Sequence, residues 1–251
     1  MNAAAKIIIT LLSIATVIAI IAGVYMHVWK GRGFSVSSKM VEDKVTLEGE
    51  VKNLTVNMDL TDLTVEPGKE LSVAYHLPES MVPEVSLQNG TLEIKSPQGM
   101  VTLPLNTGNF YVSVTIPEKT DLEEVTLKVD AGNQLVKDLK CGKLEAHGDA
   151  GNVDLTNVEC TEISTHVDAG NVELKGCHTD TLKARVDAGN LDLTDCVVSQ
   201  IDAEVDAGNI EAKDSSIETG ICKTDLGNIS LSGNIGDVKT KTSVGDVSIN
   251  K

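Results

Sequence analysis

Two pairs of potential metal ligands stand 19 residues apart in the second half of the chain. Each pair is a histidine followed two positions later by an aspartate, first His147 with Asp149 and then His166 with Asp168. Imidazole nitrogens and carboxylate oxygens are donors that zinc and related transition metals accept, so two such pairs side by side could hold an ion. Later copies carry Arg185, Glu204 and Lys223 in place of the histidine. This favours the alternative that the column only balances the charge of the aspartates.

The aspartates belong to a longer series with the same 19-residue step. Its members are Asp130, Asp149, Asp168, Asp187, Asp206 and Asp225. Carboxylates stacked about 5 Å apart repel one another unless counterions, amides or cations lie between them. Calcium is one such counterion, but the Gly-Gly-x-Gly-x-Asp pattern of calcium-binding repeats is absent. We therefore expect these residues to act in turns, and we expect no resident metal or cofactor.

Each of the first five aspartates opens the tetrad Asp-Ala-Gly-Asn. The perfect copies run from Asp130–Asn133 to Asp206–Asn209, and two degenerate copies follow at Asp225–Asn228 and Ser243–Asp246. Glycine suits a left-handed or strained turn, and the flanking Asp and Asn can bond the amides of that turn. The predicted turn ladder comprises Asp130, Gly132, Asn133, Asp149, Gly151, Asn152, Asp168, Gly170, Asn171, Asp187, Gly189, Asn190, Asp206, Gly208, Asn209, Asp225, Gly227 and Asn228.

Short groups of alternating apolar residues fill the space between the tetrads. In one repeat these groups are Leu182–Val186, Leu191–Leu193 and Cys196–Val198. Three apolar sides describe a closed coil that cannot bury its inner face alone, whereas coils stacked about 4.8 Å apart share one core. The sequence therefore predicts an all-β fold, a single-stranded parallel β-solenoid (β-helix) of about seven 19-residue coils over residues 122–251.

The preceding region, residues 33–121, is β-patterned but irregular. Strands are expected at Val51–Met58, Leu71–His76, Thr91–Lys95 and Phe110–Ile116, with breaks at Pro67, Pro78, Pro83, Pro97 and Pro117. A hidden coil is also expected, because Leu54, Val56, Met58, Asp59, Asp62, Leu63 and Val65 reproduce the spacing of the repeat. We predict that this region caps the solenoid, since a repeat protein must shield its first unit.

All five cysteines fall at positions that point into the predicted core. They are Cys141, Cys160, Cys177, Cys196 and Cys222. They would pack well there as small apolar groups. Cys141 with Cys160, and Cys177 with Cys196, would be neighbours in consecutive coils, so either pair could form a disulfide if the domain is exported. Nothing in the spacing demands a bridge, and Cys222 would remain single.

A hydrophobic segment, Ile7–Trp29, precedes these regions and holds no charged side chain. As a helix it would be roughly 35 Å long, enough to cross a bilayer, so residues 1–32 are predicted to be a membrane anchor. A cleavable signal peptide is the alternative, since Ile20-Ile21-Ala22 is an acceptable cleavage context. The run continues to Trp29 and is followed by Lys30 and Arg32, which favours an uncleaved, single-pass anchor. The short N-terminal tail favours a soluble domain outside the cell.

Composition argues against several classes of function. The net charge is −16, and all 37 acidic residues lie at Glu42 or beyond, so the soluble part should repel nucleic acid. No aromatic residue follows Tyr111, which removes the usual stacking surfaces of a binding site. Tight turns of constant length leave no loops to build a cleft, and no nucleotide-binding, zinc-protease or serine-hydrolase motif occurs. We therefore expect that the protein is not an enzyme.

The recurrent Gly-Asn or Gly-Asp turn followed by alternating apolar residues is the pattern of a known family. Gly189–Leu193 and Gly245–Ile249 are examples. Over about residues 45–250 the chain resembles the putative adhesin β-strand-repeat proteins, bacterial cell-envelope proteins whose domain is of unknown function. The perfect tetrads here are more regular than the usual pattern of that family. The resemblance implies attachment to a Gram-positive membrane and, for some members, envelope-stress signalling.

These observations predict a membrane-anchored envelope protein whose rigid rod serves as an adhesin-like interaction or scaffold module. Its partner would be a protein or a cell-wall polymer. The alternative is a membrane-attached cytoskeletal polymer formed by end-to-end self-association, because the sequence finishes on a strand, Val247–Ile249, with no obvious cap. Lys239 and Lys241 make that last coil polar, which resembles edge protection. A calcium-dependent polysaccharide enzyme is a third and disfavoured reading.

Overall fold

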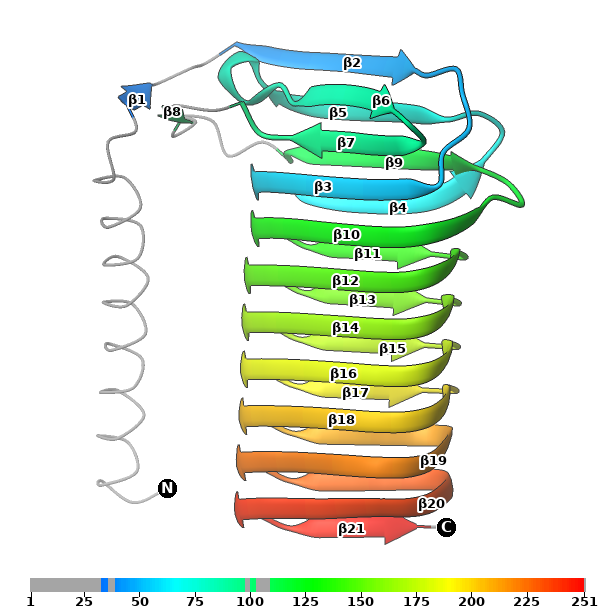
Figure 1. The fold of residues 1–251 in the computed structure, drawn as a ribbon. Coiled ribbons are helices and arrows are strands. Elements are labelled where there is room, and N and C mark those ends of the chain that lie inside the picture. The colour runs from blue at the N-terminus through cyan, green and yellow to red at the C-terminus, as the bar shows by residue number, and fades with distance from the viewer. Residues whose placement is uncertain (1–32, 36–38, 98–99, 103–108, 251) are drawn as a thin grey trace.

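The computed structural model describes residues 33–35, 39–97, 100–102 and 109–250, and Figure 1 shows them as a stack of β-strands beneath a more irregular end. Nineteen strands join in one continuous sheet that winds around the rod. The predicted all-β parallel solenoid of about seven coils is therefore confirmed. The predicted anchor, Ile7–Trp29, lies outside the described residues. Within the described residues, no helix is long and apolar enough to cross a membrane.

Each regular coil consists of a long strand followed by a short one. The long strands are β10 (Asp121–Ala131), β12 (Lys140–Ala150), β14 (Glu159–Ala169), β16 (His178–Ala188) and β18 (Val197–Ala207). The short strands are β11 (Gln134–Lys137), β13 (Val153–Thr156), β15 (Val172–Lys175) and β17 (Leu191–Thr194). The last coils are built from β19 (Ile210–Leu226), β20 (Ile229–Val244) and β21 (Val247–Asn250).

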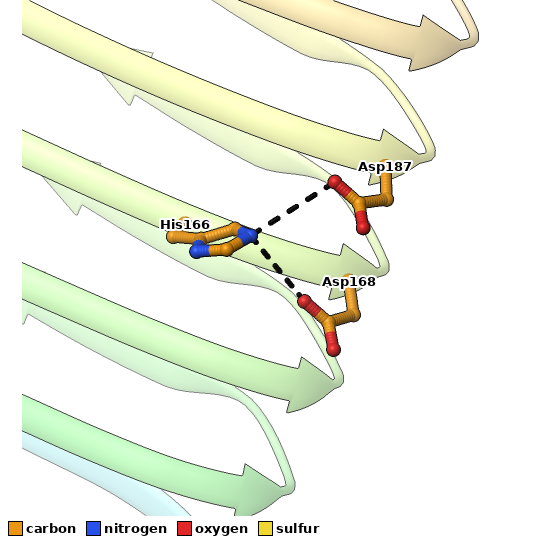
Figure 2. Close-up of side chains that lie close together, drawn as sticks. All are labelled: His166, Asp168 and Asp187. Carbon is orange, nitrogen blue, oxygen red and sulfur yellow. Dashed lines mark ion pairs between the residues drawn. The ribbon is translucent and has the colours of Figure 1, made fainter.

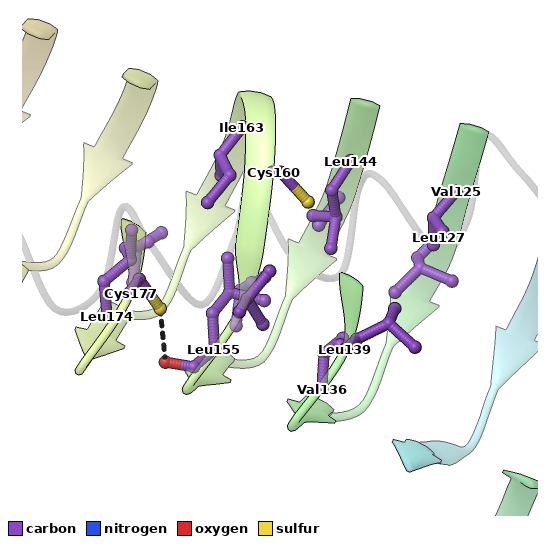
Figure 3. Close-up of a cluster of buried hydrophobic side chains, with 14 of the residues drawn as sticks. Val125, Leu127, Val136, Leu139, Leu144, Leu155, Cys160, Ile163, Leu174 and Cys177 are labelled. Atoms are coloured by element: carbon purple, nitrogen blue, oxygen red, sulfur yellow. Dashed lines mark hydrogen bonds between the residues drawn. The ribbon is translucent and has the colours of Figure 1, made fainter. Parts of the chain in front are cut away.

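The register between coils follows the 19-residue step that the sequence predicts. Val167 of β14 lies opposite Val186 of β16, which in turn lies opposite Val205 of β18. All three are buried, as are the residues of the other coils that Figure 3 shows pointing into one shared interior. The step shortens by one residue between β19 and β20, where Ala212 pairs with Leu231 but Ser215 pairs with Gly233.

Burial along a long strand shows how only two strands form the three apolar sides of a coil. In β14 the buried residues alternate from Ile163 to Val167, and Cys160 is buried before them. Thr161 and Glu162 interrupt the alternation, because two consecutive residues there are not buried. The long strand therefore supplies two of the predicted sides, and the short strand after the tetrad supplies the third.

The hidden coil predicted at Leu54 is present. It consists of β3 (Asn53–Leu60) and β4 (Asp62–Gly68), which pair in parallel with β10 and β11. Leu54 lies opposite Val125, and Val65 lies opposite Val136, so the spacing of the repeat holds across an insertion of more than fifty residues. The stack of coils therefore begins within residues 33–121, and the remainder of that region forms the cap.

The insertion between β4 and β10 closes this end of the stack. β7 (Thr91–Lys95) lies parallel on β3, and β9 (Tyr111–Pro117) lies parallel on β4. Antiparallel strands then cover them: β6 (Glu84–Gln88) on β7, β5 (Ser72–Pro78) on β9, and β2 (Met40–Thr46) on β5. A single 3-10 turn, η1 (Glu79–Met81), follows β5, and β1 (Gly33–Ser35) pairs separately with β8 (Met100–Thr102).

Two details of the cap differ from the sequence-based expectation. β2 and β6 are additional strands, and their alternation is weak because neither contains a fully buried residue. Pro67 was expected to end a strand but lies inside β4, opposite Ile116. β11 pairs with β4 only as far as Val65, so a residue without an amide hydrogen is accommodated beyond that point.

Candidate functional site

The tetrad turn forms a ridge along the rod, because each turn lies directly against the one before it. Gly189 has φ of 151°, a conformation that residues with a side chain rarely adopt. A Cβ atom at this position would overlap the carbonyl oxygen of Gly170 in the preceding coil. Glycine is therefore required here both by the backbone conformation and by the close approach of successive coils.

The asparagines of the tetrads form a continuous hydrogen-bonded ladder. The backbone N–H of Asn190 donates to Oδ1 of Asn171 over 2.9 Å, and Oδ1 of Asn190 accepts from the backbone N–H of Asn209 over 2.9 Å. The ladder starts at Asp62, whose Oδ1 accepts from both the backbone and the side chain of Asn133. These side chains were expected to bond the amides of their own turn, but they reach one coil further and join neighbouring turns.

The aspartates point outward beside a second column of side chains, two positions earlier in the sequence. Lys128, His147, His166 and Arg185 follow one another in register in this column. Lys128 Nζ lies 3.4 Å from Asp130 Oδ1, and Arg185 Nε lies 3.4 Å from Asp187 Oδ1. The hydrogen bond to Asp187, together with the charge of Glu204, raises the pKa of the Arg185 guanidinium.

The four candidate ligands that were weighed and disfavoured as a metal site from the sequence, His147, Asp149, His166 and Asp168, are only partly brought together. The rings of His147 and His166 meet edge to face with their centroids 6.1 Å apart. Within the described ranges, the group whose ligand atoms converge is His166, Asp168 and Asp187 (Figure 2). His147 and Asp149 are not part of it, and Asp187 of the next coil takes their place. Sequence reasoning missed Asp187 because it paired each histidine only with the aspartate of its own coil.

A separate column of acids runs along the short strands. Asp154, Glu173, Asp192 and Glu211 pair successively in register, so four carboxylates stack on one outer face. Burial, followed by the charge of Glu173, raises the pKa of Asp154. Burial and the charge of Glu211 likewise raise the pKa of Asp192. The 19-residue step could have revealed this column, since each acid lies five residues after an aspartate of the tetrads.

The cysteines occupy the inward positions that were predicted for them, and only one of the two pairs that could form a disulfide does so. Cys141 and Cys160 form a disulfide between β12 and β14, with their Cα atoms 4.9 Å apart. Cys177, Cys196 and Cys222 are free and buried. Cys177 Sγ donates to the carbonyl oxygen of Leu155 over 3.3 Å (Figure 3). Its hydrogen bond with Cys196 and its burial raise the pKa of the Cys177 thiol, and burial raises that of Cys222 to about 12.

The surface of the last coils carries an open hollow lined mainly by charged side chains. Those that line it include Glu204, Asp206, Lys223, Asp225 and Lys241. Acids and lysines alternate around it, and the tetrad ridge forms one border. The hollow therefore lies on the ladder of aspartates, since Asp206 and Asp225 line it.

Known proteins were found that share this architecture, and one family model matches the sequence. No relative among curated proteins matches the chain. The fold is similar to that of a putative lipid binding protein from Parabacteroides distasonis ATCC 8503, with a TM-score of 0.61 and 18% identity over 87% of this chain and 100% of that one. It is also similar to a putative adhesin from Parabacteroides merdae ATCC 43184, with a TM-score of 0.50 and 16% identity over 87% of this chain and 100% of that one. The family model described as Toastrack DUF4097 matches residues 51–251, and the chain therefore belongs to that family.

Proposed function

We propose that this chain is a non-enzymatic envelope protein, held at the cell membrane by Ile7–Trp29 with its solenoid outside the cell. Its rigid rod acts as an adhesin-like interaction or scaffold module for a protein or a cell-wall polymer. The observation that carries the proposal is the Asp-Ala-Gly-Asn turn that recurs in the regular coils. Because the same tetrad closes coil after coil, the side of the rod is a regular array of charged columns and not a loop-built cleft.

The array suits a partner that itself has a repeating structure. The ladder of aspartates with its cationic neighbours and the column of Asp154, Glu173, Asp192 and Glu211 both recur at the coil spacing of about 4.8 Å. The name of the similar protein from Parabacteroides merdae, a putative adhesin, supports an interaction role. A role in envelope-stress response is the finer part of the proposal. It predicts that deleting the gene lowers survival under cell-wall damage and that a version lacking Ile7–Trp29 fails to restore it.

The topology is tested with an epitope tag placed after Lys251, joined through a site for an added protease. Tight turns can resist proteolysis, so the cleavable linker reports exposure even if the rod stays intact. We expect the protease to remove the tag from intact cells while a cytosolic control protein stays whole. A tag that is protected until the cells are lysed would contradict the extracellular part of the proposal.

Self-association is a second candidate function, favoured by the last described coil. Val247 is 44% exposed and Ile249 is 37% exposed, although their counterparts in the preceding coil, Ile229 and Leu231, are fully buried. The opposite end carries the antiparallel strands β2, β5 and β6, which cannot continue a parallel ladder of coils. Contact through the last coils therefore predicts pairs and not filaments. Sedimentation of the full-length protein at low and high salt distinguishes monomers, pairs and filaments.

A further inference from the structure

The column of side chains beside the aspartates has permanent positive charges at Lys128 and Arg185, and the two coils between them carry His147 and His166 instead. Lys128 and Arg185 each lie 3.4 Å from the aspartate of their own coil. His166 occupies the equivalent position, one step before Arg185 in the column. An imidazole, unlike an ammonium or a guanidinium, can present an unprotonated nitrogen that binds a metal ion. The carboxylates of Asp168 and Asp187 are therefore joined by a potential ligand where other coils supply a fixed cation.

The geometry at this step brings three ligand atoms together. His166 Nε2 lies 3.4 Å from Asp168 Oδ1 and 3.9 Å from Asp187 Oδ1, and the three atoms all lie within 4.8 Å of one another. Figure 2 shows Nε2 directed between the two carboxylates. Atoms that bind one zinc ion at about 2.0–2.2 Å lie about 3.4 Å from one another in a tetrahedral site. Small side-chain movements would therefore complete the arrangement.

The nitrogen itself gives a second and independent indication. Nε2 of His166 is covered from solvent although the side chain is 42% exposed, and among the described residues it faces the two carboxylates without forming a hydrogen bond. A covered polar atom without a partner costs free energy unless something satisfies it. A metal ion between the carboxylates would satisfy Nε2 and would also reduce the repulsion between Asp168 and Asp187.

We propose that His166, Asp168 and Asp187 bind one divalent transition-metal ion of the zinc class on the outer face of the rod. Nε2 of the imidazole supplies the nitrogen ligand, and each aspartate supplies one carboxylate oxygen. Water completes the coordination, because the site opens outward. Calcium fits poorly, since it prefers about six to eight oxygen ligands and the group offers a nitrogen.

Arg185 competes for the same carboxylate. Its Nε lies 3.4 Å from the Oδ1 atom of Asp187 that also faces His166. The guanidinium has other partners in reach, since its terminal nitrogens lie 3.7 Å from Glu204 and 4.0 Å from Asp206. It can therefore release Asp187 when a metal ion arrives, and its charge should weaken metal binding.

The test is calorimetric titration of the metal-free, full-length chain with zinc chloride alone and, separately, with calcium chloride. We expect one zinc ion per chain in the wild type. His166→Lys, which copies Lys128 and so preserves the charge of the column, should weaken zinc binding at least about tenfold. Asp187→Asn should do the same. The matched control, His147→Lys in the preceding coil, should leave zinc binding unchanged, and Arg185→Gln should tighten it.

Unchanged far-ultraviolet circular dichroism shows that each variant is folded before its affinity is compared. The proposal fails if the wild type does not bind zinc, or if His166→Lys binds zinc as the wild type does. It also fails if calcium binds as tightly as zinc and His166→Lys leaves both unchanged, because the acidic ladder alone would then be the binding site. Loss of binding in both His147→Lys and His166→Lys would return the site to the two-histidine arrangement and overturn the role of Asp187.

Discussion

The regular coils and the N-terminal cap both pair β-strands over a buried core, but they pair them in different ways. In the coils each residue pairs with its own counterpart 19 positions away, so Val167 meets Val186 and one turn repeats along the rod. In the cap each pairing is between unlike segments, as when β9 covers β4 in parallel and β5 covers β9 in the opposite direction. In the coils, a contact that stabilises one pairing is therefore repeated along the rod. In the cap, each pairing depends on its own individual contacts.

The comparison also explains why charge behaves differently in the two regions. Stacking like on like places Asp154 against Glu173 and Asp192 against Glu211. In the cap, Glu66 of β4 has Thr115 of β9 as its counterpart. The register that stacks apolar residues inside the coils thus also stacks these acids outside them, and the coils carry this cost on the outer face of the short strands.

The contrast is tested most severely at two glycines. Gly189→Ala places a side chain where the coil backbones touch, so we expect it to lower the free energy of unfolding by more than about 3 kcal/mol. Gly90→Ala lies in the hairpin turn between β6 and β7, where a Cβ would meet only the side chain of Lys52 at 3.4 Å or more. Its left-handed φ of 78° should cost about 1 kcal/mol. Urea unfolding followed by circular dichroism measures both, and equal losses would refute the close approach of successive turns.

The disulfide offers the next largest effect. It closes a loop of one coil, so reducing Cys141–Cys160 should lower the free energy of unfolding by about 3 kcal/mol. Thermal unfolding with and without dithiothreitol measures this change. The double variant Cys141→Ala, Cys160→Ala serves as the control and should not respond to the reductant. If it does respond, Cys177 and Cys196 form a second bridge.

The asparagine ladder should have an intermediate effect. Asn190→Ala removes an acceptor from the amide of Asn209 and leaves Oδ1 of Asn171 with one donor fewer, so we expect a loss of about 1–2 kcal/mol. Asn190→Asp retains the acceptor and should cost less, as Asp62 does at the head of the ladder. Asn57→Ala, on an exposed position of β3, is the matched change in the first coil and should cost no more than about 0.5 kcal/mol. Chemical denaturation would contradict the ladder's role if all three variants behaved alike.

The smallest effect is a dependence on pH that arises from the acid column. The pKa of Asp192 is raised in the folded protein, so between the unfolded value of about 3.9 and the raised value the folded state binds more protons. Stability should therefore fall as pH rises through that window. Asp192→Asn removes this slope and should stabilise the protein at neutral pH by a few tenths of a kcal/mol, a modest gain because solvent screens the partly exposed group.

The control for this last effect is Glu66→Gln in the cap, whose counterpart is uncharged. It removes a negative charge that has no acid stacked against it, so it should change the free energy of unfolding less than Asp192→Asn does. Urea titrations at several pH values between about 3 and 7 measure both variants. An equal response of the two would show that stacking of acids between coils does not matter.

The sequence predicts most of the coil region because the information there is repeated. The step from Val167 to Val186 and the reappearance of the same spacing at Leu54 were sufficient to place the core and the hidden coil. The cap was harder, since β2 and β6 contain no fully buried residue and leave little alternation to detect. Unlike segments that pair once give no periodic signal.

The candidate site shows a similar limit. The repeat placed His166 and Asp168 on one outer face, but it could not show that the imidazole also faces Asp187 one coil later, which depends on side-chain direction. Spacing alone also could not choose between the two cysteine pairs. Cys141 with Cys160 and Cys177 with Cys196 share the same separation of 19 residues, and only the former is bonded.

From Asn133 to Asn228, the asparagine ladder gives each junction between neighbouring coils the same hydrogen bond from a backbone N–H to an asparagine Oδ1. Oδ1 of Asn152 accepts the amide of Asn171 just as Oδ1 of Asn190 accepts that of Asn209. Excising one whole unit, residues 168–186, would join Val167 to Asp187 and present Asn190 to Asn152 as an equivalent partner. Duplication or loss of whole 19-residue units can therefore change the length of the rod during evolution in steps of about 4.8 Å. Such a change requires no new kind of contact between coils.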